Sequence, residues 1–124
     1  MATLDPFINQ HYLNLETRRK NGQPMPTPVW FVQDGNVLYV RTIKDSGKVK
    51  RARNNPQVRI MPCGRAGEPL GEWIPARARE VTDSAVHERV RALLWEKYGP
   101  MVGQFEARAR ESGLEYTILE IIVE

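Results

Sequence analysis

Two short turn sequences, Asn21-Gly22 and Asp34-Gly35, place the strongest constraint on how the first third of this chain folds. Asn-Gly and Asp-Gly supply the positive φ angles that tight β-hairpins require. They separate three segments with strand-like patterns, which cover residues 12–19, 26–32 and 36–42. Prolines open the second segment and suit the start of a strand or an edge strand. We therefore expect three antiparallel strands joined as a meander.

Three more segments have strand patterns, and they cover residues 57–63, 72–81 and 114–124. Asp83 is placed to cap a helix with apolar residues at helical spacing, and Gly99-Pro100 ends it and begins another helix that runs to about residue 112. About six strands with two or three helices and short turns predict a mainly β fold with α-helices (α+β), built as a small antiparallel barrel.

The chain has 124 residues, which fits a single domain spanning 1–124, and its net charge of +3 does not by itself imply nucleic-acid binding. Cys63 is the only cysteine, so no internal disulfide forms, which fits a reducing cytoplasm. No apolar run approaches a membrane span, and the N-terminus lacks a signal-peptide core. We expect a cytoplasmic protein without a membrane segment.

Four cations fall within six residues at 48–53, in a short helix expected at 47–54 that Asp45 or Ser46 caps and Asn55-Pro56 ends. On a helical wheel, Val49 and Ala52 form a narrow apolar stripe. The cations divide into two sets: Lys48 and Arg53 flank the stripe, whereas Lys50 and Arg51 point outward. A solvated basic helix is one interpretation of this cluster.

An anion site is the other interpretation of the basic segment. Lys48 lies at the helix N-terminus, where a cation opposes the helix dipole, so local helix stability does not explain it. Ser46, Gly47 and the first free amides form an anion cradle that Lys48 would complete. The segment is therefore predicted to hold a phosphate or a carboxylate.

The order of these features resembles a known family. The stretches "TPVWFVQDGNVLYVRTIKDSGKVKRARNNPQVRIMPC" and "GRAGEPLGEWIPARAREV" are similar to the pyridoxamine 5′-phosphate oxidase-like split barrels, and within them to the group that depends on the deazaflavin coenzyme F420. The resemblance covers residues 12 to 81, more than half of the chain. It implies a six-stranded antiparallel split β-barrel of the FMN-binding type that forms a homodimer, with the cofactor, F420 or FMN, in a groove between subunits.

The resemblance also implies site residues. Those matching Thr27, Pro28, Val29 and Trp30 line the flavin or deazaflavin ring. The ribityl and phosphate part of the cofactor is held by the residues that match Arg41, Thr42, Ser46, Gly47 and Lys48, with Arg53 as a further match. Lys50 and Arg51 would meet the acidic tail of the deazaflavin. The substrate-phosphate signature of the family's oxidases is not found, so the resemblance does not extend to that activity.

Other candidate residues give simpler interpretations. Cys63 has no histidine nearby in sequence, which favours a buried structural thiol over a nucleophile. His11 and His87 lack metal-ligand spacing, so no metal site is predicted. Trp30 and Trp73 suit either a core or the wall of a flat ring. No Ser-His-Asp, P-loop or GxGxxG pattern is visible, and no catalytic residue is predicted.

Three functions stay open at this point. The first is an oxidoreductase that passes a hydride from the bound cofactor to a small, flat organic acceptor. The second is a split-barrel module that binds a flavin or haem without turnover. The third, less favoured, is a nucleic-acid binder that uses the basic helix.

Overall fold

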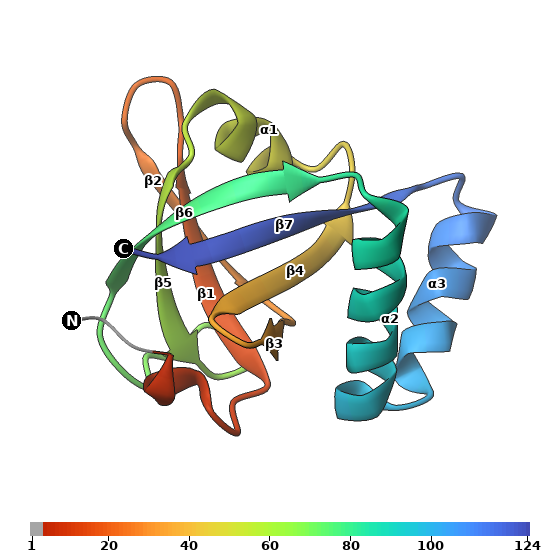
Figure 1. Cartoon of the computed structure of the whole chain (residues 1–124). Helices are drawn as coiled ribbons and strands as arrows, with labels where there is room; N and C mark the ends of the chain where they lie inside the picture. Colours follow the sequence, from red (N-terminus) through yellow and green to blue (C-terminus); the bar gives the residue numbers. More distant parts are fainter. Residues whose placement is uncertain (1–3) are drawn as a thin grey trace.

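The computed structural model of the protein describes residues 4–124, and Figure 1 shows a curled sheet with helices at its side and at one end. The elements follow in the order η1 (Asp5–Phe7), β1 (Tyr12–Arg18), β2 (Pro24–Val29), β3 (Val32–Asp34), β4 (Val37–Ile43), α1 (Gly47–Asn54), β5 (Gln57–Cys63), β6 (Ile74–Val81), α2 (Ser84–Tyr98), α3 (Met101–Glu111) and β7 (Tyr116–Val123). The predicted class, an antiparallel barrel-like sheet with helices, is confirmed.

The seven strands form one antiparallel sheet in the order β2-β1-β5-β6-β7-β4-β3. Its two edge strands, β2 and β3, are joined by only Trp30 and Phe31. A link from Val29 to Val32 reaches about 11 Å at most. Flat strands spaced about 4.8 Å apart would put the edges of this sheet nearly 30 Å from each other. The short link therefore requires the sheet to roll up until its edges meet.

This link corrects the expected strand count of six. The segment predicted as one strand at 26–32 is broken at Trp30, which gives a seventh strand. Both hairpins are confirmed, with φ angles of 87° at Gly22 and 64° at Gly35. The expected three-strand meander is wrong, because β2 pairs with β1 whereas β3 pairs with β4 at the other edge of the sheet.

The edge position of β2 follows from its prolines. Pro24, Pro26 and Pro28 alternate along the strand, so their missing N–H groups all fall on one side. That side faces away from β1, where no ladder partner is needed. The prediction that these prolines mark an edge strand is confirmed.

The barrel interior holds the main core. Its largest fully buried side chains include Phe7, Leu13, Leu15, Phe31 and Leu38. Helix α1 covers one end of the barrel, where Ala52 joins this core (Figure 1). Val49 and Ala52 are both buried, which confirms the apolar stripe predicted for the basic helix.

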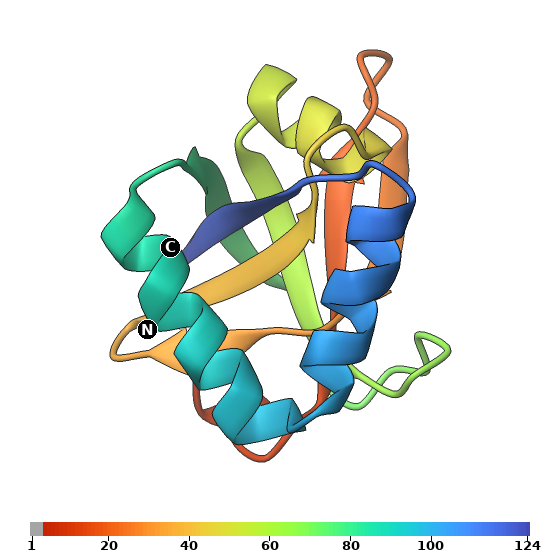
Figure 2. The ribbon, with the colours of Figure 1, turned by 90° about the vertical axis from the view of Figure 1, so that its right-hand side faces the viewer.

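Helices α2 and α3 lie side by side against the outside of the barrel (Figure 2). A second apolar cluster joins them to the sheet through Val32, Val90, Leu94, Val102 and Ile118. Asp83 caps α2 as predicted, and its carboxylate accepts hydrogen bonds from the amides that follow it, at 2.8 and 3.2 Å. None of the helices within residues 4–124 is long and apolar enough to cross a membrane.

The last turn of α2 holds the link between the two edge strands. The Phe31 amide donates to the Tyr98 hydroxyl at 3.1 Å, and Lys97 Nζ donates to the Phe31 carbonyl at 2.9 Å. The Trp30 ring stacks on Tyr98 with a centroid distance of 4.1 Å and an interplanar angle of 7°. We call these contacts the α2 clamp. They fix the place where the barrel closes.

We predict that Tyr98→Phe lowers the free energy of unfolding by about 1–3 kcal/mol, because the part-buried Phe31 amide loses the hydroxyl to which it donates. Urea unfolding followed by circular dichroism measures this. Tyr116→Phe is the matched control, since its hydroxyl makes one exposed contact of 3.3 Å to the Phe105 carbonyl. Equal losses in the two variants would contradict the role given to the clamp.

Candidate functional site

A cavity of about 250 Å³ opens where β2, β4, α1 and the two outer helices meet. Its lining consists of Thr27, Pro28, Val29, Trp30, Arg41, Thr42, Lys48, Leu94, Phe105 and Tyr116. The first seven of these residues were singled out from the sequence. The structure therefore brings together three separate stretches of the predicted site, at 27–30, 41–42 and 48.

Local structure explains why those stretches meet. Residues 27–30 are the end of edge strand β2 and the start of the link. Arg41 and Thr42 lie near the end of β4, and a short turn leads from there into α1, which begins at Gly47. Leu94, Phe105 and Tyr116 were not predicted for the site. They reach the cavity only through the packing of α2, α3 and β7, for which the local sequence carries no signal.

The N-terminus of α1 has an unsatisfied polar group. Ser46 occupies the N-cap position with extended backbone, yet its side chain makes no capping hydrogen bond. Its Oγ is buried and has no hydrogen-bond partner among the described residues. A buried hydroxyl without a hydrogen-bond partner destabilises the fold. Ser46 Oγ is therefore suited to donate a hydrogen bond to a ligand.

Lys48, two residues after Ser46, adds an unpaired charge at the same helix N-terminus. Its side chain is half-buried, and no carboxylate within residues 4–124 forms an ion pair with it. Burial lowers the pKa of Lys48, and the nearby positive charge of Arg51 lowers it further. A bound anion would relieve both effects. Together, Ser46 and Lys48 fit a phosphate group.

Arg51 is turned back against the barrel, which corrects the outward direction expected from the helical wheel. Its Nε donates to Thr17 Oγ1 on β1 at 2.7 Å. The guanidinium also lies directly over Gly47, where an added Cβ would be 2.7 Å from Nη1. Burial lowers the pKa of Arg51, and so does the positive charge of Arg19. Arg51 and Arg19 thus lie close enough to form a second concentration of positive charge, next to that of Lys48.

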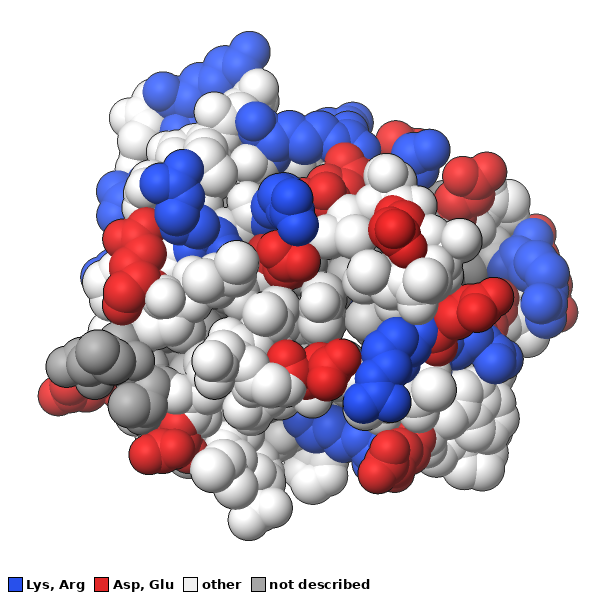
Figure 3. Space-filling model, viewed as in Figure 1, with Lys and Arg blue, Asp and Glu red and all other residues white. Residues whose placement is uncertain are grey.

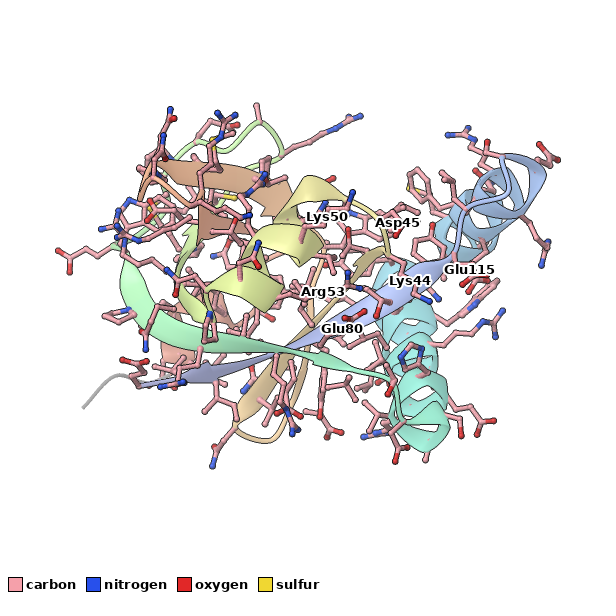
Figure 4. All side chains as sticks on the ribbon, turned by 90° about the horizontal axis from the view of Figure 1, so that it is seen from above. Lys44, Asp45, Lys50, Arg53, Glu80 and Glu115 are labelled. Atoms are coloured by element: carbon pink, nitrogen blue, oxygen red, sulfur yellow. The ribbon has the colours of Figure 1, made fainter. Side chains whose placement is uncertain are left out.

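Lys50 and Arg53 are not among the residues that line the cavity, and both lie on α1 (Figure 4). Lys50 is exposed on α1. Arg53 points to Glu80 and donates to both of its carboxylate oxygens, at 2.7 and 3.1 Å. These bonds, and a third from Thr117, lower the pKa of Glu80. Of the four clustered cations, the structure brings Lys48 alone to the cavity wall.

Figure 3 shows where the charge of this region lies on the surface. Lys and Arg side chains gather along the end of the molecule formed by α1 and the turn between β1 and β2. Acidic side chains are interspersed below it. The basic surface is therefore local, as the sequence indicated, and continues past α1 onto the neighbouring hairpin.

Arg41 reaches the cavity with its charge already paired. Its Nη1 donates to Glu106 Oε2 on α3 at 2.7 Å, and its guanidinium lies 4.4 Å from the centroid of the Tyr116 ring. Arg91 on α2 binds the same carboxylate through two bonds of 3.0 Å. Hydrogen bonds from Arg91 and Arg41 lower the pKa of Glu106. This network fastens α3, and with it Phe105, over the cavity.

The aromatic residues divide between the site and the scaffold. Trp30 forms a cavity wall, and its ring meets Phe105 edge-on at 5.2 Å between centroids. Trp73 does not reach the cavity and instead lies under the Arg59 guanidinium, 4.9 Å from it. Cys63 is buried, as predicted, and burial raises the pKa of its thiol. His87 is half-buried, and its Nε2 lies 2.7 Å from the Val81 carbonyl oxygen.

Comparison with known proteins supports the fold. A family model described as pyridoxamine 5′-phosphate oxidase matches residues 2–124. No curated protein matches the sequence. Among solved structures, the haem storage protein HutZ from Vibrio cholerae is 23% identical with a TM-score of 0.73, over 99% of this chain and 92% of that one.

Two further structures share the fold. An FAD-binding protein from Mesorhizobium loti is 20% identical with a TM-score of 0.67, over 100% of this chain and 89% of that one. An F420 reductase is 18% identical with a TM-score of 0.64, over 100% of this chain and 94% of that one. The three neighbours have one architecture and differ in the cofactor that their names give.

Proposed function

The chain belongs to the pyridoxamine 5′-phosphate oxidase family, and from that premise we propose that it is an oxidoreductase with a phosphate-bearing, flavin-type cofactor. The cofactor is coenzyme F420 or FMN, and the reaction is hydride transfer to a small, flat organic acceptor. One observation carries the proposal. At the start of one helix, an unsatisfied buried hydroxyl lies two residues before an unpaired lysine that lines an aromatic-walled cavity.

Each part of the site has a task under this proposal. Thr27, Pro28, Val29 and Trp30 line the ring of the cofactor. Ser46, Gly47 and Lys48 hold its phosphate. Thr42 borders the chain between ring and phosphate, and Arg41, already held by Glu106, orients that chain without adding net charge. When bound, the cofactor supplies the hydride, and the protein supplies position and electrostatics.

The cations outside the cavity favour the deazaflavin over FMN. Lys50 is exposed on α1, and Arg51 lies close enough to Arg19 for their like charges to interact. FMN ends at its phosphate and brings no counter-charge to these two cations. The acidic tail of F420 would neutralise them. Arg53 has no part in this arrangement, because Glu80 already pairs with it.

The same geometry disfavours a nucleic-acid binder. Arg53 of α1 pairs with Glu80 and Arg59 of β5 pairs with Glu16, each through two hydrogen bonds, so part of the positive charge on this chain is internally engaged. Nucleic-acid binding depends on unpaired cations that neutralise phosphates. A module that binds a flavin or haem without turnover remains the alternative to the enzyme, and the turnover measurement below separates the two.

We also propose a homodimer that shares the cofactor groove. The cavity of one chain, about 250 Å³, is smaller than the roughly 300 Å³ at which ligand pockets of drug-sized molecules begin. A second subunit would complete it. Ile122 on β7 is 48% exposed and borders a surface hollow with Arg53, Arg77 and Glu120, which offers an apolar contact point.

We expect light scattering to give twice the 14.2 kDa chain mass at micromolar concentration. The measurement is repeated across a dilution series. Ile122→Lys, which places a charge on the exposed apolar position, shifts the equilibrium toward monomer. A monomer at all concentrations would contradict the shared groove.

We predict that Lys48→Ala weakens FMN binding by about ten-fold or more, because a charge-assisted phosphate contact contributes roughly 1.5–3 kcal/mol. Lys50→Ala is the matched control from the same helix, and it leaves FMN affinity nearly unchanged because Lys50 is exposed and outside the cavity. Flavin fluorescence titration measures both. Equal losses would point to a diffuse basic surface.

We predict tighter binding of F420 than of FMN, tested by fluorescence titration of the purified protein with each cofactor. The preference shrinks as salt rises, since exposed charges are screened over about 10 Å at 0.1 M ionic strength. The Lys50→Ala/Arg51→Ala double variant loses the preference and still binds FMN. FMN affinity that equals F420 affinity would make this an FMN protein, and a preference independent of salt would contradict the role given to Lys50 and Arg51. Turnover of reduced cofactor with quinone or enone acceptors then separates the enzyme from a binding module.

A further inference from the structure

A second cavity of about 220 Å³ also borders Trp30, and residues at the junction of α2 and α3 help to line it. Its lining consists of His11, Tyr12, Trp30, Lys97, Tyr98 and Met101. Trp30 is the one residue that it shares with the cavity described above. None of the other five was predicted for a site, and the proposed cofactor makes no use of them.

Lys97 gives this second cavity its chemical character. Its side chain is half-buried, and no carboxylate within residues 4–124 pairs with it. One N–H binds the Phe31 carbonyl at 2.9 Å, and the ammonium lies 3.6 Å from the centroid of the Phe31 ring. An ammonium has three N–H donors, so two are left for other partners. Burial without a counter-charge lowers the pKa of Lys97 to about 8.

The surroundings of Lys97 are aromatic. Tyr12, Trp30 and Tyr98 line the cavity with flat rings, and His11 meets Tyr98 edge-on at 6.0 Å between centroids. Stacking places Trp30 and Tyr98 parallel, which gives the cavity a rigid wall. Met101, the first residue of α3, also borders it, so the positive end of that helix dipole lies at the rim.

We propose that this cavity binds a small planar aromatic carboxylate. The carboxylate accepts from Lys97, and the ring lies among the aromatic side chains. The volume suits one or two fused rings, since larger drug-sized ligands occupy pockets of roughly 300 Å³ and more. The proposal does not depend on the cofactor, because it needs only the residues of the second cavity.

Benzoate is the probe for the first test. We expect it to change the fluorescence of Trp30 in a saturable way, and the Trp30→Phe variant identifies the reporter among the three tryptophans. Two analogues test the chemistry. Benzamide keeps the ring and loses the charge, whereas cyclohexanecarboxylate keeps the charge and loses the flat ring. Each is expected to bind about ten-fold more weakly than benzoate. Equal binding of benzoate and benzamide would overturn the proposal.

The pH dependence gives a second test on the unmutated protein. Benzoate binds the protonated form of Lys97, whose pKa in the free protein is about 8, so affinity falls as pH rises from 7 to 9.5. The other titratable groups that line this cavity are His11 in the loop before β1, Tyr12 on β1 and Tyr98 on α2. Burial raises the pKa of Tyr98. His11→Gln and Tyr12→Phe variants are expected to keep the fall. Affinity independent of pH over this range would contradict a Lys97 contact.

Lys97→Met removes the charge and keeps a long side chain. We expect benzoate affinity to fall about ten-fold or more while FMN affinity stays within two-fold, and Lys97→Arg to retain benzoate binding. Circular dichroism checks that Lys97→Met is folded, because the lysine belongs to the α2 clamp. If that variant does not fold, the analogue series and the pH profile decide. Unchanged benzoate affinity in a folded Lys97→Met protein would overturn the proposal.

Discussion

The two-residue link between β2 and β3 is the constraint on which the rest of this structure depends. Trp30 and Phe31 join strands at opposite edges of the sheet, and so short a link requires a rolled sheet. The roll places the Phe31 side chain in the core, where it is 1% exposed. Its backbone amide and carbonyl have no strand to pair with there, and the last turn of α2 satisfies both.

Placing the closure at Trp30 also determines where ligands can bind. The Trp30 indole stacks on Tyr98 and lines two cavities. One cavity meets the N-terminus of α1 and carries Lys48. The other meets the junction of α2 and α3 and carries Lys97. Trp30, at the point where the barrel closes, is therefore a wall shared by two chemically distinct cavities.

The sequence predicted the parts of this structure that local physical chemistry decides. The Asp83 cap, the hairpins and the buried stripe of α1 depend on residues within a few positions of each other. The division of the segment at 26–32 was missed because it depends on pairing with strands far along the chain. Arg51 was placed outward for the same reason, since Thr17 on β1 draws it back. Of the residues that line the candidate cavity, those on β2, on the link after it, on β4 and on α1 were named from the sequence, whereas those on α2, α3 and β7 were not.

Pairing among the cations explains which of them are available for ligands. A carboxylate engages Arg41, Arg53 and Arg59, whereas Lys48 and Lys97 are half-buried without one in the described chain. Burial lowers the pKa of both lysines below the usual value, so between the folded and unfolded pKa values the unfolded chain binds more protons. The fold is therefore less stable below that range than above it, with the range for Lys97 beginning near pH 8. A bound anion would remove this cost at either lysine, and the two unpaired charges thus mark the places where this fold is stabilised most by a negatively charged ligand.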